Sequence, residues 1–288
     1  MTSEALALVL GAALLHAGWN ALAKRARDPQ AFLWWATCVG AVALLPFGIA
    51  QVAASGIARA AAPFMVATIL LHGFYFYALG RAYRTGAFSL VYPVARGLGV
   101  AVVPGVALVV FDERLSSVGV LGIALVVAGV VALHFAPGGT PGAGVPAARF
   151  GAASAWAVIT GLTIATYSLV DKAGVAHLHP VVYMTVIGIG CAVVLLPALA
   201  GRGDAVRREW AENWRTIVAA GVMTGVGYML VLFAFRLSKT GYVVAAREMS
   251  IVFSAVIGSV WLHEGRLGPR LLGAAIILAG VVCVAAGR

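Results

Sequence analysis

Ten apolar runs alternate with short polar connections along the chain, and this pattern predicts ten membrane-spanning helices. A helix needs about 17–25 apolar residues to cross a bilayer. The runs are residues 4–23, 31–52, 62–82, 86–111, 117–136, 150–171, 180–200, 215–237, 241–262 and 269–286. The expected fold class is therefore an all-α integral membrane protein. One connection, residues 201–215, carries several charges and two tryptophans and is expected to form a short interfacial helix.

Composition and charge support this prediction. Hydrophobic residues make up 62% and charged residues 10% of the chain, and the mean hydropathy is +1.00, whereas a soluble domain carries roughly 25% charged residues. The first run follows no charged segment or cleavage site, so we expect a retained helix and not a signal peptide. The net charge of +10 does not indicate nucleic-acid binding, because the basic residues lie mostly in short connections, where lipid headgroups account for them.

An internal repeat relates the two halves of the chain. The segment that begins at Ala95 resembles the segment that begins at Ala246, with a constant offset of 151 residues. The aligned pairs are Arg96 with Arg247, Glu113 with Glu264, Gly122 with Gly273, Gly129 with Gly280, Pro29 with Pro180 and Pro46 with Pro197. We read Glu113 and Glu264 as boundary and packing residues. The glycines predict a packing seam between the last helices of the two halves, and a dimer contact stays open.

The repeat sets the predicted domain boundaries. Residues 1–136 form the first five-helix repeat, residues 137–149 a linker rich in glycine and proline, and residues 150–288 the second repeat. Because five is odd, the second repeat must enter the membrane from the opposite side. Inverted repeats of this kind are typical of alternating-access carriers, whose substrate sites lie near the bilayer midplane.

Several segments resemble one known family. These are "LLHAGWNALAK" in the first run, "SLVYPVARG" in the fourth, "DERLSSVGVLGIALVVAGVV" and the second-half segment that begins "GYVVAAREMS". They are similar to the EamA-like family of the drug/metabolite transporter superfamily. The resemblance implies ten helices, a central cavity lined by helices 1, 3, 4, 6, 8 and 9, and two cytoplasmic termini. It does not specify the substrate, since similar members move amino acids, sugars, nucleotide-linked metabolites, choline and drugs.

The distribution of basic residues favours the opposite orientation. With a cytoplasmic N-terminus, the inside connections and the C-terminus carry six Lys and Arg residues and the outside connections carry twelve. The positive-inside rule therefore favours both termini outside. Membrane orientation stays open at this point.

Two arginines in apolar runs are candidate substrate ligands. Arg96 lies about 15 Å from one end of its run and about 25 Å from the other, where an arginine costs roughly 2.5–3.5 kcal/mol on insertion scales. Arg247 lies nearer the end of its run. A guanidinium in a cavity is a natural partner for a carboxylate or phosphate. Pro93 lacks an amide hydrogen and predicts a broken helix near Arg96. The alternative is that both arginines are structural and pair with Glu248, Asp171 or helix-end carbonyls.

Polar faces of the first and third runs give further candidates. His16, Trp19 and Asn20 share one helix face, and so do His72, Tyr75 and Phe76. Asn20 could instead join two helices. Tyr92 lies in the same segment as Arg96. Glu248 is a candidate for proton coupling or ammonium binding, with an interhelical ion pair as the alternative. Asp171 and Lys172 end their run and are expected at the membrane interface.

The predicted function is secondary active transport of a small polar metabolite by alternating access. The two arginines favour a carboxylate-bearing, amino-acid-like, zwitterionic or anionic solute, with protons as a candidate coupling ion. Alternatives are an exporter of cationic or drug-like compounds, a channel or scramblase, and, more remotely, a membrane enzyme acting on lipid-linked substrates. No enzymatic activity, cofactor, metal or nucleic-acid partner is expected, and the three cysteines show no metal-like spacing. We expect a multi-pass protein of the inner (plasma) membrane, either monomer or homodimer.

Overall fold

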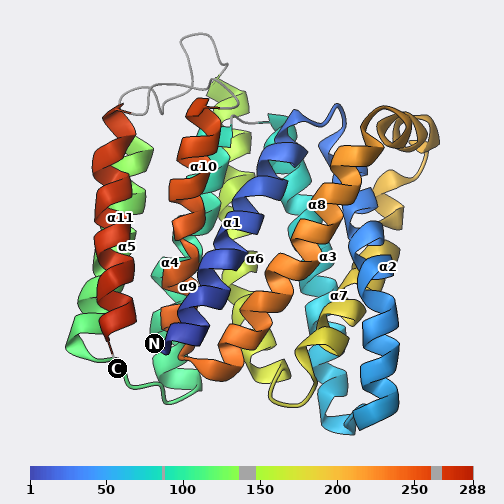
Figure 1. Ribbon diagram of the computed structural model, residues 1–288. Coiled ribbons are helices and arrows are strands. Elements are labelled where there is room, and N and C mark those ends of the chain that lie inside the picture. The colour runs from blue at the N-terminus through green and yellow to red at the C-terminus, as the bar shows by residue number, and fades with distance from the viewer. Residues whose placement is uncertain (86–87, 136–146, 261–267, 288) are drawn as a thin grey trace.

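The structure is a computed structural model that describes residues 1–85, 88–135, 147–260 and 268–287. All regular structure in these residues is helical, as predicted. The helices are α1 (Ser3–Arg25), α2 (Pro29–Ser55), α3 (Ala62–Thr85), α4 (Phe88–Val110), α5 (Ser117–Phe135), α6 (Ala147–Gly174), α7 (Pro180–Val194), α8 (Gly203–Leu237), α9 (Thr240–Arg247), α10 (Met249–Val260) and α11 (Gly268–Ala286). Two short 3-10 helices are η1 (Arg59–Ala61) and η2 (Leu196–Leu199). The long helices form one bundle (Figure 1).

The described part of each predicted run is mostly helical. Among the described residues, four helical segments are long and apolar enough to cross a membrane: Ser3–Arg25, Pro29–Ser55, Arg59–Thr85 and Gly203–Leu237. Shorter apolar helices cover Val94–Val110, Ser117–Ala132, Pro180–Val194 and Leu272–Ala286. Large apolar side chains such as Val109, Leu272 and Val42 are 85%, 70% and 69% exposed, as expected for a bundle surrounded by lipid. The protein is thus a multi-pass membrane protein, and the number of ten crossings stays a prediction.

The charged segment 201–215 forms the beginning of α8. The backbone leaves helical geometry at Asn213 (φ −124°, ψ 15°), where the Asn213 amide donates to Glu209 Oε1 at 2.8 Å. Trp210 packs on Trp35 of α2 with ring centroids 4.6 Å apart. The predicted interfacial helix is therefore the first part of a longer bent helix, joined to the bundle by aromatic packing.

A helix break does occur next to a buried arginine, but in the second half of the chain. Glu248 separates α9 from α10 with φ −68° and ψ −9°. Its amide bonds to Ala245 O at 3.1 Å, and its own carbonyl accepts from Ile251 N at 2.8 Å. In contrast, α4 continues through Pro93, so the break predicted at that position is wrong. A proline in a membrane helix is tolerated where neighbouring groups compensate the lost amide.

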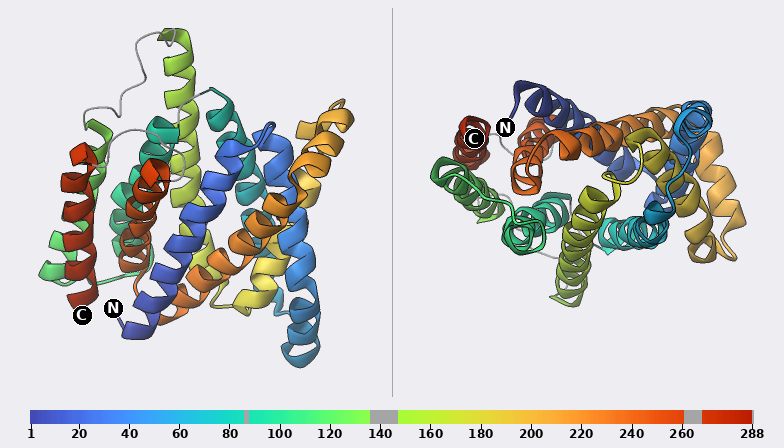
Figure 2. Two further views of the ribbon diagram at one scale, coloured as in Figure 1. Left: turned by 45° about the horizontal axis from the view of Figure 1, so that its top comes forward. Right: turned by 90° about the horizontal axis from the view of Figure 1, so that it is seen from below.

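Glycines allow α5 and α11 to approach closely, side by side at one end of the bundle (Figure 2). A Cβ atom added to Gly122 would lie 2.7 Å from the carbonyl oxygen of Gly280, and one added to Gly129 would lie 2.8 Å from that of Gly273. Only residues without a side chain permit this separation. The predicted glycine seam therefore lies inside one chain. Glu264 and residues 137–146 of the predicted linker lie outside the described residues.

Candidate functional site

A small cavity of about 30 Å³ lies between the helices in the interior of the bundle. Its lining residues come from α1, α3, α6, α7, α8 and α9: Ala12, His16, Trp19, His72, Tyr75, Phe76, Tyr167, Met184, Ile187, Thr224, Gly227, Tyr228, Val231 and Arg247. The expected lining by the fourth helix is not seen among the described residues, and α7 contributes instead. Its lining combines apolar walls with a few polar groups, as small-molecule sites commonly do.

Arg247 is the cationic side chain of the cavity wall. It ends α9 immediately before the helix break, and it is 3% exposed. Its guanidinium lies over the ring of Tyr228, 5.4 Å from the centroid. Within the described residues, Arg247 forms no ion pair with a carboxylate. The cavity therefore presents a positive charge that protein carboxylates leave uncompensated at short range.

Arg96 serves a different purpose, although it occupies the matching position of the first half. Its Nη2 atom lies 2.9 Å from Glu248 Oε1 and donates to the backbone carbonyl of Arg247 at 3.2 Å. Both side chains of the Arg96–Glu248 pair are almost fully buried. Arg96 thus binds the helix break itself and satisfies a carbonyl that the end of α9 leaves without a helical partner.

Aromatic rings form most of the wall around Arg247. His16 meets Trp19 edge-on with centroids 5.0 Å apart, and Tyr167 contacts both His72 and Tyr228, with centroids 4.2 Å and 5.7 Å apart. These rings come from α1, α3, α6 and α8. A bound molecule would contact flat apolar faces together with several hydroxyl and imidazole groups.

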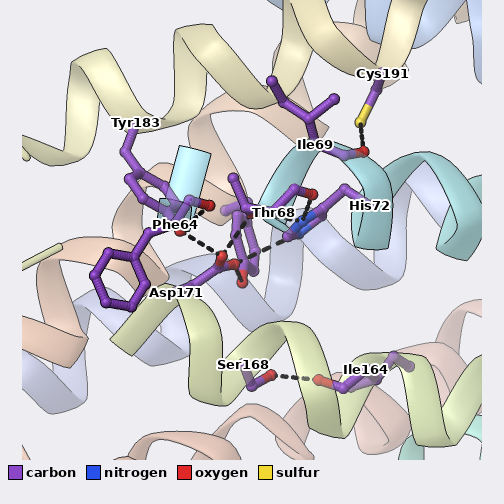
Figure 3. A network of polar contacts seen from close by, with 10 residues as sticks. Phe64, Thr68, Ile69, His72, Ile164, Ser168, Asp171, Tyr183 and Cys191 are labelled. Carbon is purple, nitrogen blue, oxygen red and sulfur yellow. Dashed lines mark hydrogen bonds and ion pairs between the residues drawn. The ribbon is translucent and has the colours of Figure 1, made fainter. Parts of the chain in front are cut away.

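Asp171 is the centre of a polar network beside the cavity (Figure 3). Its Oδ1 accepts hydrogen bonds from Thr68 at 2.6 Å and Tyr183 at 2.9 Å, and its Oδ2 accepts one from Tyr228. His72 Nε2 lies 3.7 Å from the same Oδ2. Asp171 is 0% exposed, so its side chain lies inside the protein, and its predicted location at the membrane interface stays a prediction.

Lys172 shows why two neighbouring residues differ in location. Its ammonium group turns to the carbonyls of Phe235 and Ser238 at 2.6 Å and 2.9 Å, where it caps the C-terminal end of α8. Successive helix positions diverge by about 100°, so one side chain of the pair binds a helix end and the other enters the bundle.

Two family models match this chain. Residues 151–286 match the model of the EamA-like transporter family, and residues 34–126 match the model described as Small Multidrug Resistance protein. Residues 151–286 are just under half of this chain, and they are similar to the EamA-like transporter family. The described residues contain no strand, and their multi-pass helical bundle agrees with this similarity.

Individual relatives add information on fold and length. The chain is 24% identical over 132 residues to a Sinorhizobium sp. protein described as an uncharacterized transporter in the cobO 3′ region. That alignment covers 45% of this chain and 94% of the relative, so the relative is about as long as half of this chain. A solved crystal structure has the same fold, with a TM-score of 0.72 and 19% identity over 98% of this chain and 96% of the other.

The predicted site residues divide into two groups. Those that line the cavity are His16, Trp19, His72, Tyr75 and Arg247. The others do not line it: Arg96 and Glu248 pair with each other, Tyr92 is buried on α4, and Asn20 joins α1 to α3 by accepting from Tyr83 at 2.6 Å. The structural alternative stated for Asn20, Arg96 and Glu248 thus describes the contacts they make.

Sequence reasoning missed Tyr167 and Tyr228 in the cavity wall and Asp171 behind it. One signal could have found two of them, because Tyr167 and Asp171 are four residues apart and share a helix face. Tyr228 is isolated in an apolar run, and its sequence neighbours give no such signal.

Proposed function

We propose that this protein is a secondary carrier for small carboxylate-bearing metabolites, amino-acid-like or other zwitterionic or anionic solutes, moved by alternating access. The observation that carries the proposal is the Arg247 guanidinium in the wall of the cavity, without a carboxylate partner among the described residues. A carboxylate of the solute would pair with this guanidinium through charge-assisted hydrogen bonds. The proposed location is the inner (plasma) membrane.

The glycine contacts support two inverted repeats as the basis of alternating access. Gly122 contacts Gly280, and Gly129 contacts Gly273, although the sequence offset aligns Gly122 with Gly273 and Gly129 with Gly280. Such crossed contacts between equivalent positions are characteristic of a two-fold relation. Because the contacts run antiparallel along α5 and α11, the axis would lie across the helices, in the membrane plane.

The aromatic wall favours a second candidate, a carrier of cationic or drug-like compounds. Organic cations bind to the faces of Trp and Tyr rings, and the cavity presents Trp19, Tyr75, Tyr167 and Tyr228. Two charges oppose this candidate. Arg247 would repel a cation, and the Glu248 carboxylate that could attract one is paired with Arg96.

Uptake into proteoliposomes decides between the two candidates. Purified protein is reconstituted, and the uptake of labelled amino acids, dicarboxylates and quaternary amines is compared. We expect saturable uptake of at least one carboxylate, its loss in Arg247→Gln and partial recovery in Arg247→Lys. Arg207→Gln is the matched control, because Arg207 is 79% exposed and pairs with Asp204 at the surface. Saturable uptake of quaternary amines alone, unaffected by Arg247→Gln, would establish the second candidate instead.

A further inference from the structure

The network around Asp171 can take up one more proton. Among the described residues, no donor places a hydrogen between the Asp171 carboxylate and the Nε2 atom of His72. Thr68, Tyr183 and Tyr228 all place hydroxyl groups on the Asp171 carboxylate. Three donors on two oxygens stabilise the ionised carboxylate. Each hydroxyl has a single hydrogen, so none of the three can donate to a second acceptor at the same time.

This arrangement fixes the tautomer of His72. Its Nδ1 atom lies 3.0 Å from Thr68 Oγ1 and 3.1 Å from the Thr68 carbonyl oxygen. The carbonyl only accepts, and the Thr68 hydroxyl has already donated its hydrogen to Asp171. Nδ1 must therefore be the donor, and the neutral ring carries its hydrogen there.

The other ring nitrogen, Nε2, then carries no hydrogen. It is a hydrogen-bond acceptor that faces another acceptor, the Asp171 carboxylate. His72 Nε2 is buried without a hydrogen-bond partner, and its nearest charged neighbour is Asp171 Oδ2 at 3.7 Å. Figure 3 shows the imidazole and the carboxylate pointing toward each other. A proton between these atoms would satisfy Nε2 and convert a lone-pair contact into an ion pair.

We propose that His72 and Asp171 form the proton-binding site that couples proton movement to transport, an inference that rests on the proposed carrier function. In the binding step, a hydronium ion transfers a proton to the lone pair of His72 Nε2: one O–H bond breaks, one N–H bond forms, a water molecule is released, and Asp171 stays ionised. His72 lines the cavity, so the proton and the solute reach the same space. Buried His and acidic groups recur in proton relays of transporters.

Charge balance explains why a proton and a carboxylate would travel together. The charged side chains around the cavity are Arg96, Arg247, Glu248 and Asp171, and their charges cancel when the histidines are neutral. A carboxylate alone leaves one excess negative charge in a medium of low dielectric constant, and a proton alone leaves one positive charge. When the carboxylate and the proton are both bound, the charges around the cavity cancel again. Binding of the proton should therefore raise the affinity for the carboxylate, and binding of the carboxylate should raise the affinity for the proton.

Other titratable groups near the pair set the conditions of the test. From the elements packed around it, they are His16 (α1), Tyr75 (α3), Tyr167 (α6), Tyr183 and Cys191 (α7), Tyr228 (α8) and Arg247 (α9). His16 is the group in this set that could titrate in the same pH range as His72. The readout must therefore report on His72 individually.

Nuclear magnetic resonance of ¹⁵N-histidine-labelled protein in lipid nanodiscs provides this readout without any solute. The His72 signals are those absent from His72→Gln, and His177→Gln, at an exposed loop position, is the matched control. We expect Nδ1–H and a bare Nε2 at high pH, and protonation of Nε2 at lower pH. In Asp171→Asn, Nε2 should need at least a tenfold higher proton concentration. A neutral ring with hydrogen on Nε2, or equal titration in both proteins, would overturn the proposal.

Proteoliposomes then separate this inference from the proposed function. With an inward proton gradient and the carboxylate panel, we expect gradient-driven accumulation by the wild type. His72→Gln and Asp171→Asn should equilibrate the carboxylate across the membrane without accumulating it. Carboxylate uptake that is the same with and without the proton gradient would contradict the proposed coupling site, but it would not contradict the carrier function. A titrating His72 in a protein that moves none of the carboxylates would support the proton site and contradict the proposed solute class.

Discussion

Arg96 donates a hydrogen bond to the backbone carbonyl of Arg247 at 3.2 Å, and these residues occupy matching positions in the two halves of the chain. One arginine of the pair stabilises a helix break with its side chain, and the other sits at that break and extends its side chain into the wall of the cavity. The repeat has thus placed one residue type at two equivalent positions, and the structure uses them for different purposes.

Loss of the Arg96 side chain should destabilise the protein strongly. Arg96→Met leaves Glu248 buried without its cationic partner, and removal of one member of a buried pair costs about 3–5 kcal/mol. The double variant Arg96→Met with Glu248→Gln should be more stable than Arg96→Met alone, because neither charge of the pair is then left buried without the other. Denaturant unfolding in detergent measures both effects.

A matched exposed pair provides the control for this measurement. Arg27 lies 3.0 Å from Glu212 with both side chains largely exposed. Arg27→Gln should change the free energy of unfolding by less than about 1 kcal/mol. An Arg96→Met effect as small as the Arg27→Gln effect would show that the buried pair contributes nothing to stability.

The contact between α5 and α11 should not tolerate a side chain at Gly122. In Gly122→Ala, the new Cβ would meet backbone atoms of α11 at 2.7 Å, and backbone cannot rotate away as a side chain can. We expect a loss of roughly 1–3 kcal/mol, as for other overpacked interiors. Gly105→Ala is the control, because nothing lies within 4 Å of its added Cβ. Equal thermal stability of the two variants would contradict the close approach.

Glu113 should protect the beginning of α9 from hydrogen exchange. Its carboxylate accepts from the amide and the hydroxyl of Thr240, both at 2.6 Å, and from the amide of Gly241 at 3.3 Å. In Glu113→Ala, the amides of residues 240–241 should exchange about tenfold faster, which corresponds to the roughly 1–2 kcal/mol of a lost cap. Asp204→Asn, at a surface ion pair, should leave this segment unchanged. Unaltered exchange in Glu113→Ala would show that the cap does not hold α9.

The sequence predicted the helical class and the position of each apolar run, because lipid imposes a hydrophobic pattern that periodicity alone can detect. It also predicted five of the side chains in the cavity wall, through the shared helix faces of α1 and α3 and the cost of a buried arginine. The sequence could not show that Arg96 and Arg247 make different contacts, because both are arginines in equivalent segments. Only their neighbours in space distinguish a guanidinium held by Glu248 from one that faces a cavity.

Asp171 shows a second limit of the sequence. Near the end of a helix, an aspartate is usually solvated, and the sequence position of Asp171 does not reveal that its side chain is buried. Three hydroxyl groups from α3, α7 and α8 make its burial favourable, and these groups lie up to 103 residues away along the chain. Long-range compensation of this kind has no local signature in the sequence.

The central claim, that Arg247 binds the carboxylate of the solute, is tested most directly by a binding cycle. Calorimetry compares the affinity of the best-transported carboxylate with that of its neutral amide, in the wild type, Arg247→Gln and the Arg207→Gln control. Charge-assisted hydrogen bonds contribute about 1.5–3 kcal/mol, so the wild type and the control should prefer the carboxylate about 10- to 100-fold. Arg247→Gln should bind both ligands with similar affinity, and an unchanged preference in that variant would contradict the claim.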